Sequence, residues 1–202
     1  MAGATVTNNQ ANFTKSGQYV NLPSGLFGSY TAVSVEAWVT TTGINSGYAP
    51  IFIFGAASGT GSNDWIQICR KDILDTFQLS WFNSAGVQSY YISSALVDSQ
   101  KNVHVLVTVS AGDFARLYIN GVLQGSTPVV VTAIPPPSVF YIGRSFDVNP
   151  GLIGSVNEFR VWGGALSATD IATRYSQGPG LCMLVHLSIC LSACLFVCVC
   201  VI

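Results

Sequence analysis

The stretch from residue 103 to residue 125 constrains the fold of this chain most. Its first half, V-H-V-L-V-T-V-S, alternates valine with other residues, and a period of two with β-branched side chains is the pattern of a strand. A second alternating run covers 114–119, and Asn120-Gly121 follows between apolar residues. Both residues of an Asn-Gly pair tolerate positive φ, so the pair predicts a type I′ hairpin turn. We therefore expect three antiparallel strands with one face buried against a second sheet.

Further segments alternate or form short apolar runs and are predicted to be strands: 19–22, 33–40, 51–54, 65–69, 77–82, 90–92, 139–144 and 154–162. The run 51–54 is entirely apolar, which predicts a strand buried on both faces. Ser167 is predicted to cap a helix of one or two turns, because Asp170 three residues later favours the first turn. Ile171 and Tyr175 would pack on the inner face of that helix.

Composition excludes one class of partner. Charged residues make up 8% of the chain, against roughly 25% in an ordinary soluble domain, and the net charge is −1. Affinity for a phosphate backbone needs positive charge, so no nucleic acid is expected as a partner. Cys69 is the one cysteine before residue 181, so the body of the chain is not a disulfide scaffold. We interpret Cys69 as a half-buried strand residue rather than a reactive thiol.

Four segments of the chain carry motifs of one family. They are Y-V-N-L-P at 19–23, S-V-E-A-W-V at 34–39, H-V-L-V-T-V with R-L-Y-I-N-G-V between 104 and 122, and Y-I-G-R with G-S-V-N-E-F-R-V-W-G-G-A-L-S-A-T-D-I between 141 and 171. Together they resemble the laminin G-like domains of the concanavalin A-like group, which also includes the pentraxins. The resemblance implies an all-β jelly-roll sandwich of two antiparallel sheets and a binding role in adhesion or glycan recognition.

The same resemblance raises the question of calcium. Domains of this group often carry acidic residues near the first strand and at the start of the last strand, where they help to hold a structural calcium ion. This chain has Asn12 and Asn157 at those places, and two amides supply less negative charge than carboxylates do. Asp147 and Asn149 in the preceding loop could compensate. Asp147, Asn149 and Asn157 are therefore the candidate metal ligands, and the alternative is a solvated loop without calcium.

Catalytic residues are sparse. Glycoside hydrolases need two carboxylates that face one cleft, but the chain has only two glutamates, Glu36 and Glu158, and neither has an acidic residue two to four positions away. We interpret both as polar residues of half-buried strands. His104 is the only histidine before residue 181 and stands in no recognisable nucleophile motif, so a packed strand residue is expected. The sequence predicts no enzyme.

Aromatic residues supply the candidate binding site. Sugar rings stack on tryptophan and tyrosine, so a glycan-binding module must expose some of them. Trp65 and the pair Tyr90-Tyr91 flank predicted loops and are the candidate ligand-binding residues. The predicted function is a non-catalytic binding or adhesion module that recognises carbohydrate. The alternatives are a protein-interaction domain from a larger multidomain surface protein and, less favoured, a glycoside hydrolase.

Composition changes abruptly after Gly180. We expect a sandwich domain over 1–178, whereas 181–202 holds 22 residues without an acid, lysine or arginine. As an apolar helix this segment would span about 33 Å, enough for a bilayer core. A transmembrane segment is one interpretation, and a mispredicted or read-through end of a truncated larger protein is the other. No secretory signal pattern opens the chain, and we expect a location at a membrane or an extracellular surface. Ligand identity and oligomeric state stay open.

Overall fold

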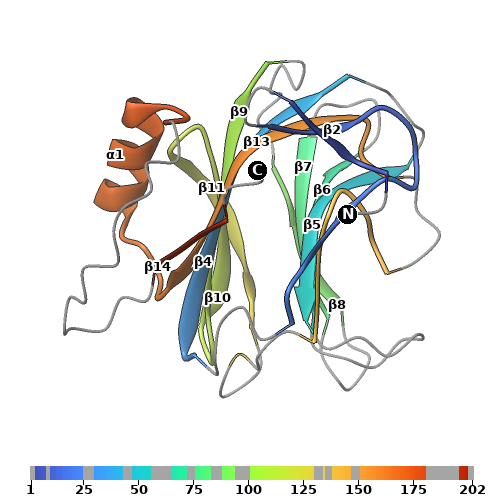
Figure 1. Ribbon diagram of the computed structural model, residues 1–202. Helices are drawn as coiled ribbons and strands as arrows, with labels where there is room; N and C mark the ends of the chain where they lie inside the picture. The colour runs from blue at the N-terminus through green and yellow to red at the C-terminus, as the bar shows by residue number, and fades with distance from the viewer. Residues whose placement is uncertain are drawn as a thin grey trace.

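The fold is two antiparallel sheets packed face to face, which confirms the predicted all-β jelly-roll class (Figure 1). The structure is a computed structural model that describes residues 3–7, 10–24, 30–42, 47–55, 65–71, 76–82, 88–93, 101–129, 134, 138–146 and 151–180, and the backbone of 196–199. Every pairing between its strands is antiparallel. Antiparallel sheets commonly bury one face and leave the other accessible, and in this chain both outer faces carry polar side chains.

The larger sheet has eight strands in the order β1-β2-β13-β4-β9-β10-β11, and β14 also pairs with β13. Its strands are β1 (Thr5–Thr7), β2 (Gln10–Phe13), β4 (Ala32–Thr41), β9 (Val103–Ser110), β10 (Phe114–Ile119), β11 (Val122–Pro128), β13 (Gly154–Gly163) and β14 (Phe196–Val199). The smaller sheet has six strands in the order β3-β12-β5-β6-β7-β8. They are β3 (Val20–Leu22), β5 (Tyr48–Gly55), β6 (Trp65–Lys71), β7 (Thr76–Phe82), β8 (Gln88–Ile92) and β12 (Val139–Ile142).

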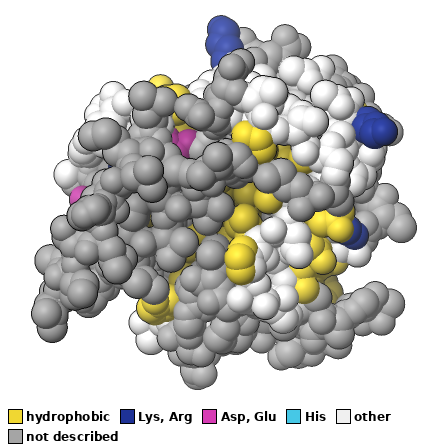
Figure 2. All heavy atoms as spheres, in the orientation of Figure 1, with side chains coloured by type: hydrophobic (Ala, Val, Ile, Leu, Met, Phe, Trp, Pro, Cys, Tyr) yellow, Lys and Arg dark blue, Asp and Glu magenta, His cyan; other side chains and the backbone are white. Residues whose placement is uncertain are grey.

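The core lies between the two sheets and is built from alternate residues of each strand. Val105, Val107 and Val109 of β9 face it from the larger sheet, and Ile66 and Ile68 of β6 face it from the smaller one. The intervening residues of the same strands point to the outer faces, as a period of two requires. The apolar run 51–54 is buried throughout, as predicted. Lys, Arg, Asp and Glu side chains are sparse on the surface that Figure 2 displays, in keeping with the composition.

The central meander forms as its sequence predicts. Strands β9, β10 and β11 pair in succession, and Ala115, Leu117 and Ile119 point into the core. Asn120 and Gly121 join β10 to β11 with φ of 49° and 77°, the left-handed values that a type I′ turn requires. An added Cβ at Gly121 would also meet the Tyr175 ring at 3.1 Å, so a side chain there would disturb helix α1 as well as the turn.

Helix α1 (Ala168–Gln177) lies against the outer face of the larger sheet (Figure 1). Ser167 caps it through a complete capping box: its hydroxyl accepts from the Asp170 backbone N–H, and the Asp170 carboxylate accepts from the Ser167 backbone N–H. The helix is longer than the one or two turns expected. Ile171 is fully buried against Leu106 and Tyr118, which are outward residues of β9 and β10.

The end of the chain departs from the predicted apolar helix. Phe196–Val199 forms strand β14, whose backbone pairs with the second half of β13, along the edge that β2 occupies beside the first half. The rest of 181–202 lies outside the described residues. Among the residues that the structure describes, no helix is both long enough and apolar enough to cross a membrane.

Candidate functional site

The outer face of the six-stranded sheet carries the candidate site. Strand register places five residues opposite one another in a row that crosses β12, β5, β6, β7 and β8: Tyr141, Ile53, Gln67, Ser80 and Tyr90. Directly opposite residues of an antiparallel pair project on the same side of the sheet. The row therefore places a tyrosine at each end and the buried side chains of Ile53, Gln67 and Ser80 between them.

A second row of outward residues lies beside the first, two residues further along each strand. It holds Trp65, Phe82 and Gln88, opposite one another on β6, β7 and β8. The rings of Trp65 and Phe82 stack with their centroids 5.2 Å apart and their planes inclined by only 1°. Together the two rows give an apolar strip bordered by a strip of amide and hydroxyl groups.

A pocket of about 320 Å³ opens over these two strips. The described residues that line it are Tyr48, Trp65, Gln67, Cys69, Gln78, Ser80, Phe82 and Gln88. No lysine, arginine, aspartate or glutamate is among them. Its described walls are therefore aromatic rings and uncharged hydrogen-bonding groups.

Gln67 presents its side-chain amide to this pocket. Its side chain is only 6% exposed, yet its amide makes no hydrogen bond with any part of the chain that the structure describes. Its neighbours differ, because Gln78 Nε2 donates to Ser80 Oγ at 2.7 Å. The amide is not among the buried side-chain groups of the described residues that lack a partner, so it is open to water in the pocket and available to hydrogen-bond a ligand.

The aromatic surface continues beyond the pocket. Phe146 meets Trp65 edge to face with centroids 6.4 Å apart, and Tyr141 meets Phe146 in the same way at 6.0 Å. The Arg144 guanidinium then lies over two rings, 4.5 Å from the centroid of Tyr19 and 4.9 Å from that of Tyr141. A line of aromatic contacts therefore leads from the pocket to β12.

Two of the three predicted ligand-binding residues lie on this face. Trp65 lines the pocket, and Tyr90, 60% exposed, follows Ser80 in the first row. Tyr91 points to the other side of β8 and packs against the core. Its hydroxyl donates to the carbonyl of Gln124, and its ring lies over Gly125, where a Cβ would come within 2.2 Å of it. Tyr91 therefore fastens the two sheets together rather than facing the pocket.

Sequence reasoning did not pick out Gln67, Ser80 and Gln88. The signal was present in the alternation of W-I-Q-I-C and F-Q-L-S-W-F, where polar residues take every second position of two predicted strands. That pattern marks an outer face. It does not show which of its amides lacks a partner, because this depends on the neighbouring strands.

Of the three predicted metal ligands, the structure describes only Asn157, so it does not show them together. Asp147 and Asn149 lie outside the described part of the chain, and Asn157 is a β13 residue whose backbone pairs with Gln10 and Trp38. Within the described ranges, no group of three or more His, Cys, Asp or Glu side chains could hold a metal ion. Calcium binding at 147–157 stays a prediction.

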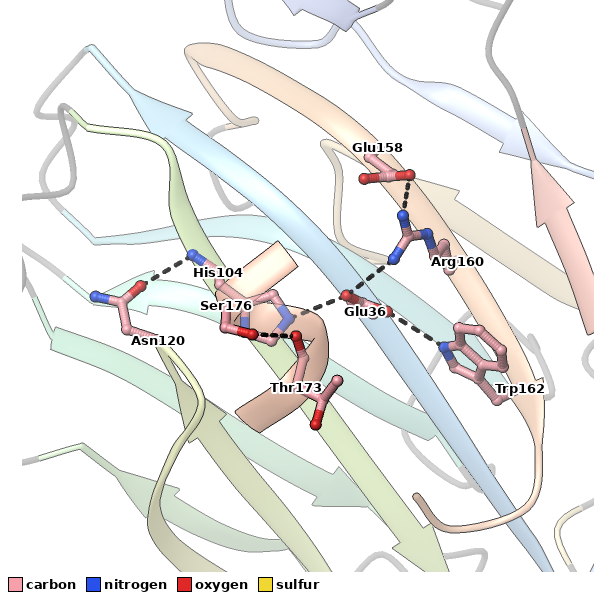
Figure 3. A network of polar contacts seen from close by, with 8 residues as sticks. All are labelled: Glu36, His104, Asn120, Glu158, Arg160, Trp162, Thr173 and Ser176. Carbon is pink, nitrogen blue, oxygen red and sulfur yellow. Dashed lines mark hydrogen bonds and ion pairs between the residues drawn. The ribbon is translucent and has the colours of Figure 1, made fainter. Parts of the chain in front are cut away.

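A second polar cluster lies on the opposite side of the molecule, beneath α1 (Figure 3). Its centre is the Glu36 carboxylate, which is 1% exposed. His104 Nε2 lies 3.1 Å from Glu36 Oε1, Arg160 donates to the same oxygen at 3.4 Å, and Trp162 Nε1 donates to Oε2 at 3.4 Å. Arg160 also contacts Glu158. The two strands that flank β4, β9 and β13, therefore both supply groups to the one carboxylate that β4 carries.

Burial and charge act on these carboxylates in opposite directions. Burial raises the pKa of Glu36, but the His104 hydrogen bond and the charges of Arg160 and Arg174 more than offset it, so the pKa lies below its ordinary value of 4.5. Burial also raises the pKa of Glu158, and Arg160 offsets only part of that rise, so this pKa lies above 4.5. Glu158 occupies a β-bulge with φ of 62°, and its side chain reaches Arg160 from there.

This arrangement suits a structural role. Glu36 is more deeply buried than predicted, because the neighbouring strands β9 and β13 contribute side chains that cover it, whereas Glu158 is half-buried. Both point at the same guanidinium, and Arg174 from α1 lies 3.5 Å over the Trp162 ring. His104 is fully buried, as expected for a packed strand residue. A charge-compensated cluster under a helix gives a substrate no cleft between its carboxylates.

Comparison with solved structures finds the same fold in proteins of different kinds. Domain 4 of AbnA, a GH43 extracellular arabinanase from Geobacillus stearothermophilus solved in complex with arabinotriose, is 21% identical over 84% of this chain and 75% of that one, with a TM-score of 0.58. A heptameric SAP-like pentraxin from Limulus polyphemus is 17% identical over 83% of each chain, with a TM-score of 0.60. Identities this low show a shared fold alone.

A toxin domain shares the fold as well. The botulinum neurotoxin serotype D ligand-binding domain, solved with N-acetylneuraminic acid, is 18% identical over 87% of this chain, with a TM-score of 0.60, and the match spans only 44% of the toxin domain. No curated protein matches the chain. A family model, described as the concanavalin A-like lectin/glucanases superfamily, matches residues 14–172, which is most of the sequence. The chain therefore belongs to the concanavalin A-like lectin/glucanase superfamily.

Proposed function

We propose that this protein is a non-catalytic carbohydrate-binding module whose site is the outer face of the six-stranded sheet. The observation that carries the proposal is the pocket in which the stacked Trp65 and Phe82 rings border the unpaired amide of Gln67. A sugar ring has an apolar C–H face and a rim of hydroxyls. An aromatic strip beside uncharged donors and acceptors matches both parts of such a ligand.

Among the described residues, no two carboxylates face one cleft, which supports a binding role over hydrolysis. Glycoside hydrolysis needs two carboxyl groups on either side of one sugar linkage. The only glutamates of the chain are engaged by Arg160 beneath α1, on the far side of the sandwich from the pocket. The related structures solved with arabinotriose and with N-acetylneuraminic acid support a saccharide as the class of ligand.

A glycan array on the full chain tests the proposal. The protein is applied once with calcium and once with EDTA, beside a Trp65→Ala variant. Phe114→Ala is the matched control, because Phe114 is an exposed aromatic residue of β10 on the other sheet. We expect saturable binding that Trp65→Ala weakens by at least tenfold and that Phe114→Ala leaves unchanged.

Each outcome of this experiment has a distinct meaning. Binding that disappears with EDTA would place calcium in the site and direct attention to Asp147 and Asn149. No binding to any glycan under either condition would contradict the proposal and favour the protein-interaction alternative. Binding that Trp65→Ala leaves intact would contradict the position of the site on this sheet.

A further inference from the structure

We infer that Arg144, beside the end of β12, is the anchor for the carboxylate of an acidic sugar. The inference rests on the proposed function and adds to it a charged site and a chemical class of ligand. It follows from three observations: what holds the guanidinium in place, what leaves it without a counter-charge, and which groups lie beside it.

The Arg144 guanidinium is held in place by two aromatic rings and by the backbone. It lies over the rings of Tyr19 and Tyr141, 4.5 Å and 4.9 Å from their centroids. These two rings meet edge to face, with centroids 5.3 Å apart. Arg144 Nε also donates to the carbonyl oxygen of Ser145 at 3.2 Å. Because these contacts orient the side chain before a ligand arrives, little rotamer freedom is lost on binding.

No described carboxylate neutralises this guanidinium. All eight lysines and arginines of the chain lie in its described part, and Arg116 and Arg160 both form ion pairs there. The contacts of Arg144 with described residues are the two rings and the one carbonyl. Its terminal nitrogens are not among the buried side-chain atoms that lack a partner, so they face solvent. A fixed cation is therefore available to an anion from outside.

The shape and charge of a guanidinium select a carboxylate. Its N–H groups form a planar fork, and a carboxylate accepts two of them side by side. A single cation also matches the single negative charge of a carboxylate, whereas a phosphate monoester carries about −1.5 to −2 at pH 7. Hydrogen bonds between ionised partners are roughly twice as strong as those between neutral groups.

The groups around Arg144 favour a sugar as the carrier of that carboxylate. The hydroxyls of Tyr19 and Tyr141 make no hydrogen bond with described residues, so both can donate to or accept from sugar hydroxyls. The Tyr141 ring also contacts Phe146, which adds a third aromatic ring beside the cation. Aromatic rings pack against the apolar C–H face of a sugar. A carboxylate on a peptide is the alternative, and the experiment includes one.

Lys71 is a second cation on this sheet, beside the pocket. Its Nζ lies 5.8 Å from the centroid of the Tyr48 ring, which lines that pocket. Lys71 is less well placed than Arg144, because it contacts one ring from further away and its ammonium is a point charge on a flexible stem. The geometry therefore assigns the carboxylate to Arg144, and a Lys71 variant tests that choice.

Isothermal titration calorimetry with matched acidic and neutral sugars tests the inference on the full chain. The acids are trigalacturonate, a glucuronic acid-bearing xylotriose and sialyllactose, each compared with its own methyl ester, and a glutamate-rich peptide is the non-sugar probe. EDTA is present throughout, so that no calcium ion can hold a carboxylate. For at least one pair, we expect the acid to bind at least tenfold more tightly than its ester at low salt, about 1.4 kcal/mol. High salt should reduce this ratio, because the cation is open to solvent.

Variants identify the cation that is responsible. Arg144→Gln should lower the affinity for the acid to that for the ester, and Arg144→Lys should retain only part of the preference. Lys71→Gln should keep the preference. Arg116→Gln is the matched control, because Arg116 is a partly exposed arginine on the other sheet. Thermal unfolding checks the fold of each variant, and the comparison of acid with ester in the wild type needs no variant to fold.

The results distinguish this inference from the function on which it depends. Equal affinity for acid and ester in every pair would overturn the inference and leave a carbohydrate-binding module in place. A preference that survives in Arg144→Gln, or that disappears in Lys71→Gln, would overturn the role of Arg144. Tighter binding of the peptide than of every acidic sugar would overturn the class of ligand. Absence of binding to all the sugars would overturn the proposed function itself.

Discussion

Glu36 holds together the outer side of the eight-stranded sheet. One carboxylate accepts hydrogen bonds from Arg160 and Trp162 and lies within hydrogen-bonding distance of His104. Because the cluster is buried, each of these groups has lost most of its contact with water. Loss of the Glu36 carboxylate therefore removes one of the two carboxylates that Arg160 contacts and the acceptor of the Trp162 N–H, and the cost exceeds that of losing a surface ion pair.

The first prediction concerns Glu36→Gln. We expect the variant to lose about 2 kcal/mol of unfolding free energy at pH 7, because Arg160 keeps only Glu158 as a carboxylate partner among the described residues and Trp162 loses a charged acceptor. Since the pKa of Glu36 is lower in the folded state than its ordinary value of 4.5, its contribution is present above that pH and is lost as the pH falls through the folded-state pKa. The stabilities of wild type and variant should therefore converge in acid. Urea unfolding at a series of pH values measures both effects.

A surface pair serves as the control. Asp113 and Arg116 form an ion pair at 3.0 Å on the exposed start of β10. Asp113→Asn should change the unfolding free energy by less than about 1 kcal/mol, since exposed pairs are well screened. Equal stability of Glu36→Gln and wild type at pH 7 would show that the cluster contributes no net free energy.

Single residues also show where reasoning from sequence reaches its limit. Trp65 and Tyr90 could be selected as aromatic residues near loops, and the structure places both on the outer face of the six-stranded sheet. Tyr91 could not be separated from Tyr90 by that argument. Adjacent strand residues point to opposite faces, and the face of β8 depends on its pairing with β7. Gln67 could not be selected from the sequence, because whether its amide finds a hydrogen-bond partner depends on the strands on either side of β6.

At the level of elements, helix α1 packs on the outer face of the eight-stranded sheet. It contacts the sheet through the buried Ile171, through Arg174 over Trp162, and through Tyr175, whose ring stacks on Trp38 with centroids 5.9 Å apart. These contacts come from two successive turns of the helix. The correct start of α1 fixes all three, and Ser167 defines that start.

The second prediction is therefore that Ser167→Ala destabilises the protein by about 1 kcal/mol, the usual cost of losing an N-cap. In a chain of this size such a loss lowers the Tm by roughly 2–4 °C. Differential scanning calorimetry measures the change. Ser176→Ala, in the last turn, is the control and should shift stability by less than about 0.5 kcal/mol. A Tm in Ser167→Ala equal to that of wild type would show that tertiary contacts alone fix the start of the helix.

The elements predicted correctly are those whose conformation is set by residues close together in the sequence. The Asn120-Gly121 turn and the Ser167 cap depend on residues within a few positions of one another, and both form as expected. The length of α1 was underestimated, because its last two turns depend on Arg174 and Tyr175 meeting strands far away in the sequence. The buried Glu36 cluster could not be predicted, since it needs the order β13-β4-β9, which alternation does not determine.

At the scale of the whole molecule, the sandwich and the segment 181–202 differ sharply in amino-acid composition. The described core clusters draw on residues from Ala11 to Ile171. The tail touches the described sandwich through the backbone of β14 on β13. The sandwich therefore already has its core without the segment 181–202, and the proposal that this segment enters a membrane can be tested apart from folding.

The third prediction follows from this separation. A chain that ends at Gly180 should keep a cooperative thermal transition, because no described core residue is removed. Flotation with phosphatidylcholine vesicles in a density gradient tests the membrane interpretation of 181–202, which flotation of the full chain alone would support. Equal flotation of the two chains would contradict a membrane role for the tail. Loss of the cooperative transition in the shortened chain would instead make β14 part of the folding unit.

The alternation of β6 and β7 has a consequence for how this protein can change. Ile66, Ile68 and Leu79 hold the sandwich together from one side of these strands, while Gln67, Ser80 and Trp65 project from the other side. Mutations on the second set leave the first untouched. Natural variation or a combinatorial library could therefore replace the recognised ligand while the scaffold stays constant, which makes this sheet a surface for evolving new specificities.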